Sequence, residues 1–169
     1  MVSFASPMIN IDPPSCPLAL DAISTLSKSG LARFVNRARV AVQLDGSVEV
    51  LLTSDAEVKR LNKGFRGINK ATDVLSFPAP EEFEGVAGDL AVSLDTAARQ
   101  AAEHGHTLKD EVRILLLHGL LHLAGEDHET DSGEMAAREM RLRKALKLPL
   151  GLIERTVSSA KKKPKAKAR

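Results

Sequence analysis

One strongly apolar segment, from Thr107 to Ala124, constrains the fold more than any other part of the chain. Its apolar residues recur at helical spacing and lie on nearly every side of the predicted helix. A helix without a polar face is stable in water only when other elements surround it. Gly125 follows directly, and glycine readily adopts the positive φ that ends a helix. We therefore expect a central, buried helix that ends at Gly125.

The flanking sequence predicts a sheet and further helices. Short apolar runs bounded by Gly, Pro or Asp-Gly predict four strands, near residues 8–12, 48–52, 72–77 and 89–93. Apolar spacing predicts one long helix from Leu20 to Val42 that continues across Gly30. Shorter helices are expected over 56–63, over 95–103 and after Asp131.

Composition narrows the class of protein. The chain has 169 residues, enough for one domain, with 43% hydrophobic and 27% charged residues. No run of 18 apolar residues and no secretory signal are evident, so we expect a cytoplasmic protein without a membrane partner. Cys16 is the only cysteine, which excludes an intrachain disulfide. Trp and Tyr are absent and Phe occurs five times, which argues against a base-stacking platform built from several aromatics.

The basic residues are unevenly distributed along the chain. Six of the 24 Lys and Arg residues fall in the segment 161–169, which contains no acid, so the rest of the chain carries an excess of four acids. This segment has no apolar periodicity, and we expect a disordered basic tail after a single domain over residues 1–160. Contact with a polyanion and a purely solubilising role are both open for the tail.

Three histidines at the end of the central helix predict a metal site. His118 and His122 are four residues apart, so their imidazoles share one helical face and can hold one ion. Gly125 can turn the chain back and bring His128 to the same ion. Three neutral imidazoles leave one open position on a tetrahedral zinc ion, which is the arrangement of catalytic sites.

The histidine spacing is also similar to the metzincin peptidase pattern H-E-x-x-H-x-x-G-x-x-H. Gly119 stands where those enzymes carry the glutamate that deprotonates the attacking water, and glycine has no side chain to act as a base. A metal-dependent peptidase is therefore a disfavoured alternative. Three neutral ligands leave the full charge of the ion in place, which favours an anionic ligand such as a phosphodiester.

A run of basic residues supports the same anionic ligand. Residues 58–72 contain five bases and no acid: Lys59, Arg60, Lys63, Arg66 and Lys70. We place Arg66 after a helix and before a strand, where its planar guanidinium could bind two phosphate oxygens. Lys63 and Lys70 are candidate RNA contacts. A solvated helix face explains Lys59, Arg60 and Lys63 equally well.

Four motifs occur in a fixed order between Val48 and Leu148. They are Leu61-Asn62-Lys-Gly-Phe65-Arg66-Gly67, Thr72-Asp73-Val-Leu-Ser-Phe-Pro78, Gly88-Asp89-Leu-Ala-Val-Ser93 and His118-Gly-Leu-Leu-His122-Leu-Ala-Gly-Glu-Asp127-His128. Together they resemble the L-N-x-x-Y-R-G, T-D-V-L-S-F-P, G-D-I-x-I-S and H-G-x-L-H-L-x-G-Y-D-H motifs of the YbeY family of single-strand-specific endoribonucleases. Four motifs in register are far more specific than one histidine pattern.

This resemblance implies a single α/β (α+β) domain, with a four-stranded mixed sheet and helices around the central metal-binding helix. It implies one zinc ion per chain at His118, His122 and His128, and a functional arginine at Arg66 facing that ion. The catalytic set would then be Arg66 with the three histidines. It also implies single-stranded rRNA of the small ribosomal subunit as the partner, with maturation of the 16S rRNA 3′ end and ribosome quality control as the role. We expect no nucleotide cofactor.

Two positions depart from the family motifs: Phe65 and Glu126 stand where the family commonly has Tyr. Glu126 could repel RNA phosphate, act as a base or point to solvent, and we expect the solvent-facing position. Asp127 either orients a ligand histidine or caps the next turn. The identity of the general base is open. Outside enzymes, the alternative is a non-catalytic ribosome-associated factor with a structural metal.

Overall fold

A single four-stranded sheet organises the residues that the computed structural model describes, 5–127 and 130–149. The strands are β1 (Met8–Ile11), β2 (Ser47–Thr53), β3 (Val74–Pro78) and β4 (Val86–Ser93), arranged in the order β1-β2-β4-β3. The first, second and fourth strands run parallel, and β3 runs antiparallel to β4. This confirms the expected single α+β domain with a mixed sheet.

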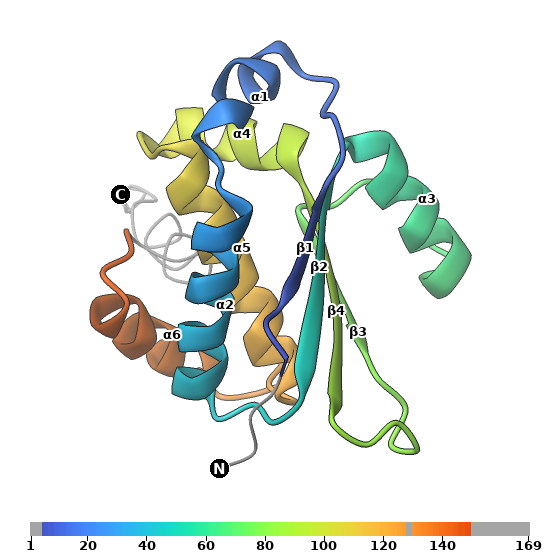
Figure 1. Ribbon diagram of the computed structural model, residues 1–169, viewed down its shortest axis with the longest axis vertical. Helices are drawn as coiled ribbons and strands as arrows, with labels where there is room; N and C mark the ends of the chain where they lie inside the picture. Colours follow the sequence, from blue (N-terminus) through green and yellow to red (C-terminus); the bar gives the residue numbers. More distant parts are fainter. Residues whose placement is uncertain (1–4, 128–129, 150–169) are drawn as a thin grey trace, which may run out of the picture.

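The helices cover the two faces of the sheet unequally (Figure 1). Of the helices in residues 5–127 and 130–149, most lie on one face, while the other face carries only α3 (Asp55–Arg66), near one end of the strands. The helices of the covered face are α1 (Pro17–Ala22), α2 (Lys28–Val42), α4 (Leu94–His104), α5 (Leu108–Leu123) and α6 (Glu134–Ala145). Within the described part of the chain, much of the α3 face is therefore left without a helix.

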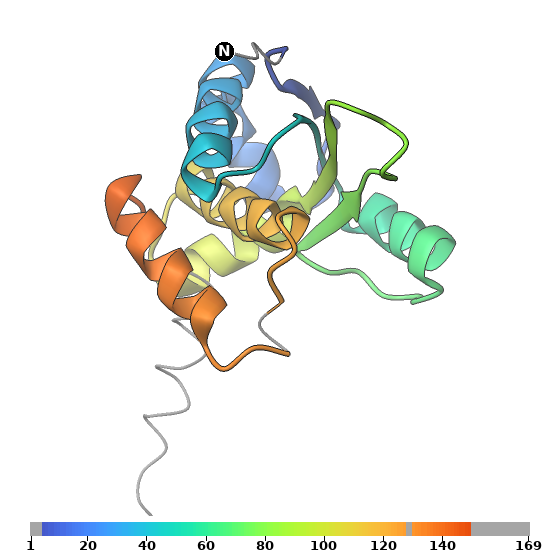
Figure 2. The ribbon, with the colours of Figure 1, turned by 90° about the horizontal axis from the view of Figure 1, so that it is seen from below.

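Helix α5 lies at the centre of the molecule, between the sheet and the outer helices α2 and α6 (Figure 2). Every residue from Ile114 to Leu121 is buried, which is more than two full turns with no face to solvent. The predicted central helix is thus confirmed. Among residues 5–127 and 130–149, no helix combines the length and apolarity that a membrane crossing requires.

The end of α5 has the geometry predicted from Gly125. Gly125 has a φ of +89°, and its N–H donates to the carbonyl of His122 at 3.0 Å. The N–H of Glu126 donates to the carbonyl of Leu121 at 3.1 Å. This pair of hydrogen bonds is a Schellman motif, which satisfies the last carbonyls of a helix and reverses the chain.

Two predicted helix boundaries are wrong. The continuous helix expected from Leu20 to Val42 is interrupted, because α1 ends at Ala22, a 3₁₀ turn follows, and α2 begins at Lys28. Ser27 starts the second helix by accepting a hydrogen bond from the N–H of Gly30 on its hydroxyl. Helix α3 continues to Arg66, beyond the expected end at residue 63, and stops where Gly67 adopts a φ of +70°.

The close approach of α5 to the sheet depends on Gly119. A Cβ atom at this position would lie 2.8 Å from Leu90 Cδ2 and 3.3 Å from both Ser76 Oγ and Val74 Cγ2. These atoms belong to side chains of β3 and β4, so even a methyl group at residue 119 would require these side chains or the helix to shift. The Ser76 hydroxyl also donates to the Gly119 carbonyl at 3.1 Å, which ties β3 to α5.

We predict that Gly119→Ala lowers the free energy of unfolding by about 1–2 kcal/mol, because overpacking outweighs the gain in helix propensity. Gly64→Ala is the matched control, since this glycine also lies in a helix but a Cβ there would meet no atom within 4 Å. The control should raise the free energy of unfolding by about 0.5–1 kcal/mol. Denaturant unfolding measures both, and equal stabilisation by the two variants would contradict the close approach.

Candidate functional site

Two of the three predicted metal ligands meet at the last turns of α5. The Nε2 atoms of His118 and His122 lie 3.1 Å apart, and the ring planes are inclined by 73°. A tetrahedral zinc ion with Zn–N bonds of about 2.0–2.1 Å needs roughly 3.3 Å between two ligand nitrogens. The two imidazoles therefore fit a shared ion with little movement.

Both histidines line a cavity of about 540 Å³ between the end of α5 and β3. The turn after α5 contributes residues 125–127 to its wall, and the segment leading into and along β3 contributes the opposite side. Helix α3 contributes Arg66. Among the lining residues, the histidines, Arg66, Glu126 and Asp127 were candidates from the sequence, whereas Thr72, Asp73 and Ser76 stood in a motif without a predicted role at the site.

Glu139 on α6 holds the other ring nitrogen of His118. His118 Nδ1 lies 3.4 Å from Glu139 Oε2, and the Glu139 side chain is 2% exposed. A proton on Nδ1 shared with this carboxylate leaves the Nε2 lone pair facing the cavity. Glu139 lies 21 residues from His118, and no short-range motif in the sequence marks it, so this contact could not be predicted from the sequence.

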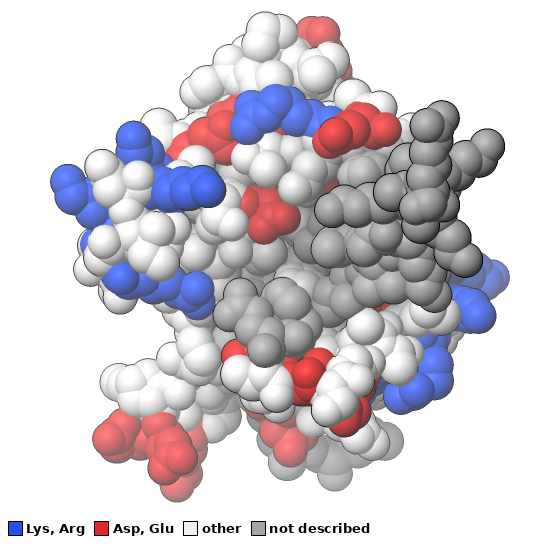
Figure 3. Space-filling view, turned by 180° about the vertical axis from the view of Figure 1, so that it is seen from behind, with Lys and Arg blue, Asp and Glu red and all other residues white. Residues whose placement is uncertain are grey.

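Arg66 reaches the cavity from the last turn of α3, which corrects its expected place after the helix. Its Nη2 donates to the carbonyl of Ser76 on β3 at 3.1 Å. Since Ser76 is also bonded to α5, the same strand fixes the guanidinium relative to the histidines. Lys63 and Lys70 are exposed and do not line the cavity. Figure 3 shows basic side chains gathered over α3 at the left of that view.

Glu126 does not point freely to solvent, contrary to the expectation from sequence. Its Oε1 atom accepts a hydrogen bond from Arg138 Nη1 at 2.9 Å, and the side chains of both residues are about three-quarters buried. Arg138 also donates to the carbonyl of Val42. Glu126 thus lines the cavity while its charge is balanced by a fixed cation.

The remaining predicted groups are incompletely described. Asp127 lines the cavity, and its backbone carbonyl accepts the N–H of Asp131 at 3.2 Å. His128 and the basic segment 161–169 lie outside the described residues. Residues 5–127 and 130–149 alone hold no group of three or more His, Cys, Asp or Glu that could hold a metal ion.

Fold and cavity define an α+β protein whose central helix presents paired histidines opposite an arginine. The family model described as Endoribonuclease YbeY matches residues 15–147. A protein of Koribacter versatilis named Endoribonuclease YbeY is 54% identical over 147 residues, which cover 87% of this chain and 95% of that protein. The protein of the same name from Solibacter usitatus is 50% identical over 137 residues, covering 81% and 91%. This chain belongs to the Endoribonuclease YbeY family, which confirms the resemblance seen in the motifs.

A third relative of that name, from Nautilia profundicola, is 54% identical over 112 residues, which cover 66% of this chain and 80% of that protein. The solution structure of TM1509 from Thermotoga maritima is 29% identical, with a TM-score of 0.49 over 96% of this chain and 100% of that one. The chain spans at least 80% of the length of each of the three relatives named Endoribonuclease YbeY.

Proposed function

We propose that this protein is a zinc-dependent endoribonuclease that cleaves single-stranded RNA in the cavity between α5 and β3. The observation that carries the proposal is the pair of imidazole nitrogens 3.1 Å apart, in a cavity whose wall also holds the Arg66 guanidinium. A cation site beside an arginine suits a phosphodiester. The name of the relatives, Endoribonuclease, supports the same reaction class.

In this proposal His118, His122 and His128 hold the ion. When bound, zinc supplies a Lewis acid and lowers the pKa of its water toward about 7. Glu139 keeps the proton of His118 on Nδ1, so that the Nε2 lone pair is directed toward the ion. Arg66 binds two oxygens of the scissile phosphate and stabilises the negative charge that develops there.

The biological substrate we propose is single-stranded rRNA of the small ribosomal subunit, processed in the cytoplasm. Maturation of the 16S rRNA 3′ end and ribosome quality control are the roles that the four motifs suggest by resemblance. Outside the segment 161–169 the chain carries an excess of acids. The basic side chains on α3 are therefore the surface that would attract and first bind such a polyanion.

The surroundings of Gly119 disfavour the peptidase alternative. The Cβ of a glutamate at this position would lie only 2.8 Å from Leu90 Cδ2 and 3.3 Å from Ser76 Oγ, closer than van der Waals contact allows. A non-catalytic factor with a structural metal is disfavoured by the cavity itself, since structural zinc sites are closed by protein ligands.

The direct test is to incubate the zinc-loaded protein with a labelled single-stranded rRNA precursor, with the same RNA annealed to its complement, and with casein. We expect internal cleavage of the single strand alone, lost on adding a chelator and regained with zinc. Cleavage of casein would establish the peptidase. Intact RNA under all these conditions would favour the non-catalytic factor.

A second prediction concerns the metal ligands and their support. We expect His122→Ala to lose most of the bound zinc, and Glu139→Gln to weaken zinc affinity by about 10- to 100-fold through misplacement of the His118 proton. Elemental analysis and competition with a chromophoric chelator measure these effects. Glu103→Gln, on the exposed surface of α4, is the control and should change nothing. Wild-type zinc affinity in Glu139→Gln would contradict the positioning role.

A third prediction separates Arg66 from its basic neighbours. Arg66→Ala should reduce kcat for RNA by about 10²- to 10³-fold, because one charge-stabilising donor is lost. Zinc content should equal that of the wild type, and the free energy of unfolding should change by no more than about 0.5 kcal/mol, since the side chain is exposed. Arg66→Lys should recover only part of the rate, because an ammonium cannot form the two-pronged contact. An equal loss in Lys63→Ala would instead indicate a diffuse charge effect.

A further inference from the structure

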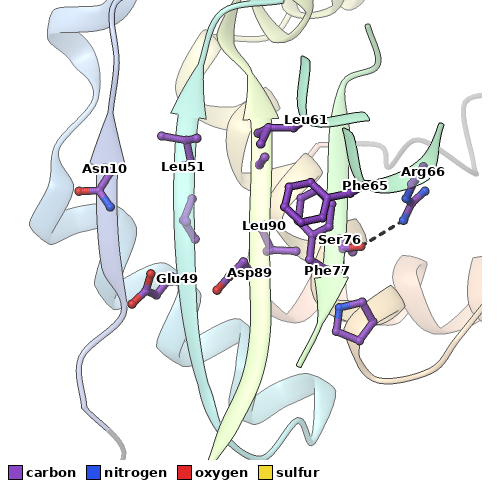
Figure 4. A pocket seen from close by; sticks show the side chains of 13 residues that line it. Asn10, Glu49, Leu51, Leu61, Phe65, Arg66, Ser76, Phe77, Asp89 and Leu90 are labelled. Atoms are coloured by element: carbon purple, nitrogen blue, oxygen red, sulfur yellow. Dashed lines mark hydrogen bonds between the residues drawn. The ribbon is translucent and has the colours of Figure 1, made fainter. Parts of the chain in front are cut away.

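A second cavity, of about 630 Å³, lies on the face of the sheet opposite α5 (Figure 4). Its floor is the exposed side of β2 and β4, and α3 forms one wall with Leu61 and Phe65. We call this cavity the sheet groove. Arg66, Ser76 and Pro78 line both the sheet groove and the histidine cavity, so the two cavities adjoin at β3.

Two phenylalanines occupy the middle of the sheet groove. The rings of Phe65 and Phe77 have centroids 5.2 Å apart, and Phe65 is 72% exposed. In Figure 4 the rings lie between Arg66 at one end and the carboxylates of Asp89 and Glu49 toward the other. Few aromatics occur in this chain, yet the fold pairs two of them beside the arginine of the site. A largely exposed ring of this kind offers a stacking face.

We propose that the sheet groove binds one unpaired nucleobase of the RNA whose phosphate contacts Arg66, with the base stacked on Phe65. This inference rests on the proposed ribonuclease function and specifies how the substrate is held. Any of the bases can stack on an aromatic side chain, because each base has a π-face, so this contact does not require a particular sequence. Phe65 and Arg66 are consecutive, so one helix end presents the stacking ring and the phosphate-binding group together.

The acidic end of the sheet groove restricts how the RNA can lie. Glu49 and Asp89 are directly paired across the parallel strands β2 and β4. Burial raises the pKa of Asp89, and the neighbouring charge of Glu49 raises it further, as expected for crowded carboxylates. These groups repel phosphates, so the RNA backbone stays on the Arg66 side and only a base can enter. Their oxygens can accept hydrogen bonds from base amino groups.

This arrangement selects unpaired RNA. A base in a duplex is stacked and paired, and it must leave the helix before it can reach Phe65. A basic segment of another protein is the alternative ligand, because its positive charges would be attracted to the carboxylates of Glu49 and Asp89. The guanidinium at the shared rim favours the phosphate-bearing ligand, because Arg66 would repel a basic segment that followed the groove into the histidine cavity.

The test measures binding of zinc-loaded protein to a fluorescent single-stranded RNA that is 2′-O-methylated throughout and cannot be cleaved. A matched series of this RNA carries one abasic position in each member. We expect Phe65→Ala to weaken binding by about 5- to 100-fold, and one abasic position to weaken wild-type binding by a similar factor. The same abasic position should not weaken RNA binding by the Phe65→Ala variant any further. Phe65→Tyr should bind as wild type does.

Phe83→Ala is the matched control, because Phe83 is 62% exposed and does not line the sheet groove. It should bind the RNA with wild-type affinity. Wild-type affinity in Phe65→Ala, or the same abasic profile in both proteins, would overturn the proposal. In that case, cleavage of unmodified RNA by the wild-type protein would still support the ribonuclease activity. Conversely, loss of binding in Phe65→Ala without any cleavage of RNA by the wild type would support the base-binding site and contradict the ribonuclease activity.

Discussion

Burial of α5 on every side is the constraint on which the rest of the structure depends. The fully buried stretch Ile114–Leu121 must be enclosed by the sheet and by α2, α4 and α6, so α5 approaches the surface at its start, where Lys109 is exposed, and at its C-terminal end. His118 and His122 occupy that end, where the helix leaves the core and borders a cavity. Gly119 is the structural requirement for this arrangement, since it lets α5 approach β3 and β4 without a side chain between them.

Polar contacts then link the four elements of the site. Glu139 of α6 orients His118 on α5, and the carbonyl of the adjacent Gly119 accepts the Ser76 hydroxyl of β3. The carbonyl of that same serine accepts a hydrogen bond from Arg66 of α3. Arginine and histidines are thus held by one continuous set of contacts. Such a set keeps catalytic groups in a fixed geometry before substrate binds, which is what electrostatic stabilisation of a charged transition state requires.

The sequence predicts the features that follow from local chemistry. The buried helix follows from its apolarity, its end from Gly125, and the family from four motifs in order. The features it misses arise from contacts between distant residues. The Glu139 contact, the pairing of Phe65 with Phe77 and the ion pair of Glu126 with Arg138 exist only once the chain is folded. The break before α2 was missed because apolar spacing continues across it, while the capping of Ser27 decides the boundary.

The central claim is that three histidines hold a zinc ion with one position left for substrate. X-ray absorption at the zinc edge, recorded on the zinc-loaded protein, tests this most directly because it counts the ligands. The account predicts three imidazole nitrogens at about 2.0–2.1 Å and one further oxygen, which an added phosphate-type ligand replaces. A spectrum with fewer than three imidazoles, or with four protein ligands that no added anion displaces, would contradict it.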